Sequence, residues 1–145
     1  YSRGADGKRL ENIVNGALSY VGKKAKVASI GWCFGGGWSL KSAILSKKQA
    51  VGSVMYYGMP VQDVEKLKTL NCEVLGLFAT EEWISKQVIE EFAVNMKTAN
   101  KSLNYKIFEA AHAFANPSNP KFDKKAATEA NAMAVKFLKE KFKLN

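Results

Sequence analysis

Apolar residues recur along this chain in two patterns that alternate from one end to the other. In the first pattern they are spaced three or four residues apart, which predicts helices with one apolar face. The segments with this spacing are residues 10–21, 38–45, 88–96 and 126–138. A shorter helix carrying Val61, Val64 and Leu67 is also expected, and Pro60 is well placed to begin it.

In the second pattern, short runs of apolar and β-branched residues predict buried strands. The segments of this kind are residues 26–30, 50–57, 72–78 and 103–107. Because strands that alternate with helices are joined by right-handed crossovers, these segments should form one parallel sheet of about four strands with flanking helices. The sequence therefore predicts a single α/β domain over residues 1–145.

Residues 31–37 read Gly-Trp-Cys-Phe-Gly-Gly-Gly and lie between the first predicted strand and the helix after it. A cysteine on a sharp strand-to-helix turn between glycines is the thiol counterpart of the Gly-x-Ser-x-Gly nucleophile elbow. Glycine lets the backbone approach closely, and the start of a helix aims N–H groups at the sulfur. We therefore expect Cys33 to be a nucleophile and the backbone N–H of Phe34 to donate to the oxyanion.

His112, the only histidine of the chain, follows the fourth predicted strand. Since reactive groups of parallel sheets gather in loops at the carboxyl ends of the strands, His112 is expected near Cys33 as its proton acceptor. Glu81 and Glu82 follow the third strand, where a carboxylate would orient the imidazole. We favour Glu82 and keep Glu81 as the alternative acid. The order cysteine, acid, histidine is that of the α/β-hydrolase triad.

Other interpretations of these motifs have less support. The glycine run lacks the Gly-Lys-Ser/Thr or Gly-x-Gly-x-x-Gly pattern of a nucleotide-binding loop. Cys72 begins a predicted strand with no evident partner and is expected to be structural, and the absence of a Cys-x-x-Cys pair argues against a thiol redox role. Two cysteines are too few for a disulfide scaffold, so we expect reduced thiols, which favours the cytoplasm.

Charge and composition bear on two further kinds of partner, nucleic acids and membranes. The chain carries 22 Lys and Arg against 13 Asp and Glu, a formal net charge of +9. The lysines are spread over several segments, which is typical of solvated helix faces rather than of a nucleic-acid surface. No apolar run approaches the roughly 20 residues of a membrane helix, so neither a nucleic acid nor a membrane is expected as a partner.

Three motifs together are similar to those of a known family. They are Gly31-Trp32-Cys33-Phe34-Gly35-Gly36, Tyr56-Tyr57-Gly58 and His112-Ala113-Phe114-Ala115-Asn116-Pro117. With them the sequence resembles the dienelactone hydrolase family of α/β-hydrolases. The resemblance implies hydrolysis of small esters or lactones by a Cys-Asp-His triad, with Cys33 as nucleophile, His112 as base and no metal or organic cofactor. The family has its aspartate where this chain has Glu81 and Glu82.

The resemblance starts near Lys26, and family members carry several strands before the elbow, where this chain has one helix. The resemblance therefore implies that the chain is the C-terminal part of a member, with a partial α/β-hydrolase fold and with the strand before Cys33 at an open edge of the sheet. Because an open edge invites pairing with another chain, we expect homo-oligomers. The alternative to a small-molecule hydrolase is a catalytically impaired or truncated hydrolase-fold module that acts by oligomerisation or binding.

Overall fold

The computed structural model of the chain describes residues 3–80 and 83–144. The helices are α1 (Arg3–Val21), α2 (Phe34–Leu45), α3 (Val64–Lys68), α4 (Lys86–Thr98) and α5 (Lys124–Phe142), with a 3-10 turn at Lys47–Gln49. The strands are β1 (Val27–Trp32), β2 (Ala50–Tyr56), β3 (Glu73–Ala79) and β4 (Leu103–Phe108). Within the described ranges, none of the helices is both long and apolar enough to cross a membrane.

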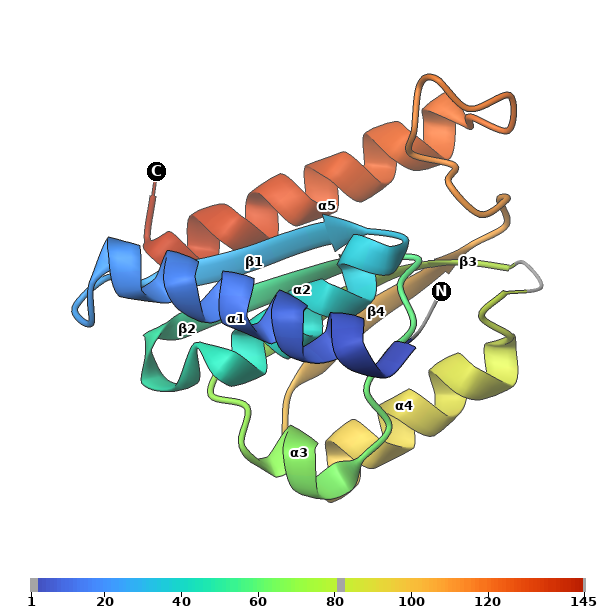
Figure 1. Cartoon of the computed structure of the whole chain (residues 1–145). Helices are drawn as coiled ribbons and strands as arrows, with labels where there is room; N and C mark the ends of the chain where they lie inside the picture. The colour runs from blue at the N-terminus through green and yellow to red at the C-terminus, as the bar shows by residue number, and fades with distance from the viewer. Residues whose placement is uncertain (1–2, 81–82, 145) are drawn as a thin grey trace.

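The strands form one parallel sheet in the order β1-β2-β3-β4, so β1 and β4 are its edges. Helices α2, α3 and α4 cover one face, α5 covers the other, and α1 lies against α2 (Figure 1). This arrangement confirms the predicted α/β class. Because all strands run the same way, the loops that follow β1, β2, β3 and β4 meet at one end of the sheet, called here the carboxyl end.

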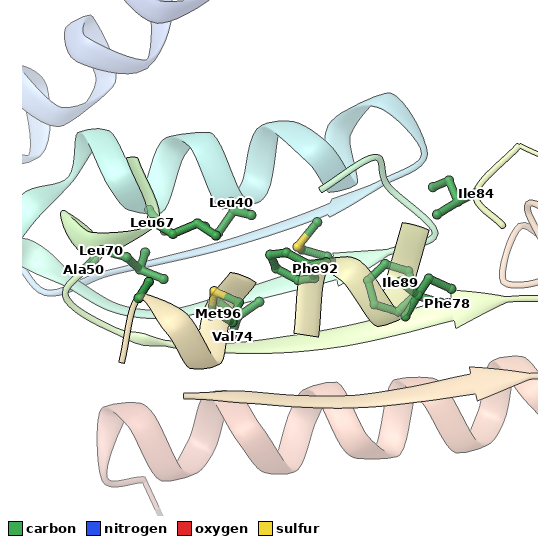
Figure 2. Packing of buried hydrophobic residues seen from close by; sticks show 13 residues of the cluster. Leu40, Ala50, Leu67, Leu70, Val74, Phe78, Ile84, Ile89, Phe92 and Met96 are labelled. Atoms are coloured by element: carbon green, nitrogen blue, oxygen red, sulfur yellow. The ribbon is translucent and has the colours of Figure 1, made fainter. Parts of the chain in front are cut away.

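The two central strands are buried on both faces, because successive side chains of a strand point to opposite sides of the sheet. On β2, Met55 joins the cluster under α2 and α4, whereas Tyr56 joins the cluster under α5. On β3, Phe78 and Leu77 divide in the same way. Figure 2 shows the first cluster, in which residues of α2, α3 and α4 gather over the sheet around Phe92.

Two predicted helix starts are wrong. The second helix begins at Phe34 and not at Trp38, because the glycine run carries no apolar pattern and still forms the first helical turn. The short helix begins at Val64 and not at Pro60. Asp63 decides this start, since its Oδ1 accepts hydrogen bonds from the backbone N–H groups of Glu65 and Lys66 and so caps the helix.

Candidate active site

Cys33 lies on the turn between β1 and α2, at the carboxyl end of the sheet. Its backbone angles, φ 55 and ψ −121, belong to a region that residues other than glycine rarely adopt. Two backbone hydrogen bonds hold this turn: the N–H of Cys33 donates to the carbonyl of Tyr56 at 3.0 Å, and the carbonyl of Cys33 accepts from the N–H of Gly36 at 2.9 Å. The cysteine itself is exposed and is a free thiol. The turn therefore presents the sulfur to solvent.

Glycines around this turn allow two stretches of backbone to touch. A Cβ on Gly36 would lie 2.5 Å from the carbonyl oxygen of Tyr56, and a Cβ on Gly58 would lie 2.3 Å from the nitrogen of Gly37. No real side chain fits at such distances. The start of α2 is thus packed directly on the segment that follows β2, which ties the position of Cys33 to the end of the neighbouring strand.

His112 approaches the sulfur from the loop after β4. Its Nε2 lies 3.0 Å from Sγ of Cys33, although the two residues are 79 positions apart in the chain. This distance is within hydrogen-bonding range for sulfur, and it agrees with the expectation that the two side chains meet at the carboxyl end. Proton transfer between the imidazole and the thiol needs no further movement of the backbone.

The loop that carries His112 is anchored by a buried aromatic side chain. Phe114 is fully buried, with its ring centroid 5.2 Å from that of Tyr57 and 5.0 Å from that of Phe108. Its carbonyl accepts from the N–H of Asp123 at 3.0 Å, which closes the loop just before α5. The imidazole is therefore carried by a loop fixed at both ends.

Glu82 and Glu81, the predicted acids, lie outside the described residues, so the choice between them stays a prediction. The residue before them is described: the N–H of Thr80 donates to the carbonyl of Phe108 at 3.1 Å. The loop after β3 therefore starts beside the end of β4, where the chain turns toward His112.

Phe34 is the first residue of α2, with its side chain 67% exposed. Backbone N–H groups in the first turn of a helix have no acceptor within the helix, and the helix dipole puts partial positive charge at this end. The N–H of Phe34 is therefore placed next to Cys33 as a donor, while its part in binding an oxyanion stays a prediction.

Two tyrosines at the end of β2 border the site. Burial raises the pKa of Tyr56 and of Tyr57 to about 12 each, so both hydroxyls are protonated near neutral pH. The hydroxyl of Tyr56 donates to Oδ1 of Asn131 at 2.7 Å, and its ring stacks on Trp32 with centroids 5.0 Å apart. In the sequence, the motif Tyr56-Tyr57-Gly58 carries part of the family resemblance and gives no direct sign that the two tyrosines border the site.

Cys72 lies at the opposite end of the sheet, just before β3, and its thiol is also free. It is partly buried and packs against the cluster under α2 and α4. Burial raises the pKa of Cys72 to about 11, and nearby Lys141 opposes this shift. These surroundings fit the structural role predicted for it. In the part of the chain that the structure describes, no group of three or more His, Cys, Asp or Glu residues is placed to hold a metal ion.

Sequence comparison finds relatives named for a lactone-hydrolysing activity. The chain is 29% identical over 126 residues to a Saccharolobus solfataricus protein provisionally named carboxymethylenebutenolidase, and the match covers 85% of this chain and 48% of that protein. It is 28% identical over 120 residues to carboxymethylenebutenolidase 1 of Cupriavidus pinatubonensis, a match that covers 78% of this chain and 48% of the relative. The chain thus spans about half the length of these two relatives.

Solved structures show the same fold. A provisionally named dienelactone hydrolase from Klebsiella pneumoniae matches with a TM-score of 0.73 at 22% identity, over 90% of this chain and 59% of that one. A dienelactone hydrolase-like promiscuous phosphotriesterase from metagenomic libraries matches with a TM-score of 0.77 at 19% identity, over 95% of this chain and 65% of that one. The model of the dienelactone hydrolase family matches residues 6–142, and this chain therefore belongs to the dienelactone hydrolase family.

Proposed function

We propose that this chain hydrolyses small esters or lactones, with Cys33 as the nucleophile and His112 as the general base. The observation that carries the proposal is the 3.0 Å distance between Nε2 of His112 and Sγ of Cys33, on a turn that exposes the sulfur. The family and the names of the two relatives support the same chemistry.

The proposed reaction has two halves. His112 takes the thiol proton, and the thiolate attacks the carbonyl carbon while the N–H of Phe34 and the start of α2 stabilise the oxyanion. His112 then gives the proton to the leaving alkoxide, which leaves a thioester on Cys33. In the second half His112 takes a proton from water, the resulting hydroxide attacks the thioester, and the acid departs as the proton returns to the sulfur. Glu82, or Glu81 in its place, would orient the imidazole.

Because the nucleophile must remain a free thiol, a reducing compartment such as the cytoplasm is expected.

The test is hydrolysis of 4-nitrophenyl acetate by the wild-type chain and by variants of the two cysteines and the histidine. Cys33→Ala should abolish turnover, and His112→Ala should lower kcat about 10²-fold to 10⁴-fold, the range for losing a general base. Cys72→Ala is the matched control and should retain activity. Equal rates in wild type, Cys33→Ala and His112→Ala would overturn the proposal. A carboxymethylenebutenolide, the substrate class in the relatives' names, is the second substrate.

The open edge of the sheet supports a second proposal, self-association. Strand β1 pairs with β2 on one side and with no described strand on the other. Ile30 and Trp32, on one face of this strand, are 42% and 44% exposed. An unpaired strand with exposed apolar side chains is a template for pairing with another chain. We propose that β1 pairs with β1 of a second copy, which would place two sheets edge to edge.

Sedimentation velocity tests this second proposal independently of catalysis. The wild-type chain should dimerise in a concentration-dependent way, and Ile30→Lys should shift it to monomer because a lysine on an edge strand opposes pairing. Val94→Lys, which puts the same charge at an exposed apolar residue of α4, is the control and should leave the dimer intact. A wild-type chain that stays monomeric at high concentration contradicts self-association.

A further inference from the structure

Tyr57 joins the elbow to the histidine loop, and no step of the proposed reaction uses it. It directly follows β2 and has φ 35, in the left-handed region. Its N–H donates to the carbonyl of Leu77 at 2.8 Å, so the backbone is tied to β3 at the end of the sheet. On one side it adjoins Tyr56, whose carbonyl accepts from the N–H of Cys33, and on the other Gly58, on which the start of α2 packs.

The ring of Tyr57 contacts two side chains of the histidine loop, those of His112 and Phe114. Its ring meets the imidazole of His112 edge to face, with centroids 5.1 Å apart and planes at 61°. It meets Phe114 in the same manner, at 5.2 Å and 69°. With 3% of its surface exposed, the ring has little room to move, so these contacts restrain the loop on the side that faces the sheet.

Cys33 is also close enough to the side chain of Tyr57 to affect its pKa. Burial is the main reason that the pKa of Tyr57 rises to about 12, and the nearby Cys33 raises it further, since a tyrosinate and a thiolate repel. A phenol with this pKa keeps its proton near neutral pH, so Tyr57 is not suited to exchange protons with the substrate. The role left to Tyr57 is to hold neighbouring side chains in position.

We propose that Tyr57 is a positioning residue: its ring holds the imidazole of His112 at hydrogen-bonding distance from Sγ of Cys33. The proposal rests on the proposed function for its catalytic meaning. The arrangement of the two reacting side chains can nevertheless be measured without any ester, through the reactivity of the thiol. A displacement of about 1 Å in such a pair is enough to cost on the order of 10²-fold in rate.

The experiment measures the rate at which iodoacetamide alkylates Cys33, by intact mass, as a function of pH. Tyr57→Leu removes the ring contacts with His112 and Phe114, whereas Tyr57→Phe keeps the ring and removes only the hydroxyl. His112→Ala gives the rate without an imidazole. Phe108→Leu is the matched control, because Phe108 packs on the same Phe114, with centroids 5.0 Å apart, and is buried to a similar degree. Circular dichroism establishes that each variant is folded.

At pH 7, Tyr57→Phe should alkylate like wild type, because it keeps the ring contacts with His112 and Phe114. Tyr57→Leu should alkylate at least about tenfold more slowly, toward the rate of His112→Ala, because the imidazole is no longer held beside the sulfur. The dependence of the rate on pH in Tyr57→Leu should likewise approach that of His112→Ala, while Phe108→Leu keeps the wild-type profile. A merely structural role would lower stability in Phe108→Leu and Tyr57→Leu alike without separating their profiles.

Three results would overturn the proposal: a wild-type profile in Tyr57→Leu, an equal loss in Phe108→Leu, or no difference between wild type and His112→Ala. Where Tyr57→Leu does not fold, Tyr57→Met, which also removes the ring, takes its place and should show the same loss. The two proposals also fail separately. If the wild-type chain hydrolyses no ester, the function is wrong, and the alkylation profile still tests Tyr57. Where esters are hydrolysed, Tyr57→Leu should lower kcat with KM changed less than about twofold.

Discussion

Residues with unusual backbone angles have different surroundings at the two ends of the sheet. Among the described residues other than glycine, positive φ values occur at Cys33, Tyr57 and Ala113 around the carboxyl end, and at Lys47, Asn100 and Lys143. The second set follows the last turns of α2, α4 and α5, where a left-handed residue ordinarily ends a helix. None of the first set follows the last turn of a helix. Cys33 instead directly precedes α2 as its N-cap residue, without a capping hydrogen bond from its side chain. Positive φ there coincides with the turns that bring Cys33 and His112 together.

The two cysteines show the same contrast in side-chain chemistry. Cys33 is exposed, with the imidazole of His112 at 3.0 Å. Cys72 lies at the amino end, partly buried among apolar side chains, and burial raises its pKa to about 11. One residue type thus serves as a candidate nucleophile in one place and as packing in the other. The comparison teaches that reactivity here comes from what each end of the sheet places around the sulfur.

The largest expected effect separates the two thiols directly. Near neutral pH, iodoacetamide should label Cys33 at least about a hundredfold faster than Cys72, because a rise in pKa from 9.0 to about 11 lowers the thiolate fraction of Cys72 by two orders of magnitude. Mass spectrometry of the labelled peptides gives both rates in one sample. The Cys72→Ala variant should be labelled like wild type, and equal labelling of the two cysteines would remove the contrast.

The next largest effect concerns the close packing at the elbow. Gly36→Ala should lower the free energy of unfolding by about 3 kcal/mol, because its Cβ would meet the carbonyl oxygen of Tyr56 at 2.5 Å and Cα of Gly58 at 2.9 Å. Gly35→Ala is the matched control, since a Cβ there has no neighbour within 4 Å, and it should change stability by about 1 kcal/mol or less. Urea unfolding measures both. Similar losses in the two variants would show that the backbone contact is not what matters.

A smaller effect is the dependence of the free energy of unfolding on pH, to which Cys72 at the amino end and the two tyrosines at the carboxyl end contribute in different pH ranges. Burial raises the pKa of Cys72 from 9.0 to about 11, and those of Tyr56 and Tyr57 from 10.0 to about 12. In these ranges the folded chain binds more protons than the unfolded chain, so the free energy of unfolding is full below pH 9 and falls as pH rises toward 12. Urea unfolding at a series of pH values should show Cys72→Ala losing the part of the decline that starts near pH 9. A variant that declines like wild type there would contradict burial as the cause.

The smallest effect compares relief of left-handed backbone at the two ends. Lys47→Gly should raise the free energy of unfolding by about 0.5–1 kcal/mol, since glycine adopts φ 49 without steric cost, and should leave the alkylation of Cys33 unchanged. Ala113→Gly removes a similar cost at φ 66 and also loosens the residue next to His112, so alkylation should slow about threefold. Thermal unfolding and alkylation rates are the measurements. Slower alkylation of Cys33 in Lys47→Gly as well would show that the two ends of the sheet do not differ in this respect.

Much of the fold follows from local pattern. The predicted strands lie within a residue or two of β1, β2, β3 and β4, because alternation of side chains on the buried strands leaves a clear apolar run. The meeting of Cys33 and His112 also follows from the sequence, since parallel strands bring their carboxyl ends to one edge of the sheet. The helix starts at Phe34 and Val64 were missed, because a glycine run and the cap at Asp63 outweigh the apolar spacing.

The sequence by itself determined the order of strands and helices, the position of a cysteine turn between glycines and the single histidine placed to meet it. These depend on residue types and spacing along one stretch of chain. Only the tertiary structure decided that the ring of Tyr57 lies 5.1 Å from that of His112, that Trp32 stacks on Tyr56, and that burial raises the pKa of Cys72 to about 11. Such features depend on which side chains from distant segments pack together and exclude water from between them. No local pattern in the sequence specifies that packing.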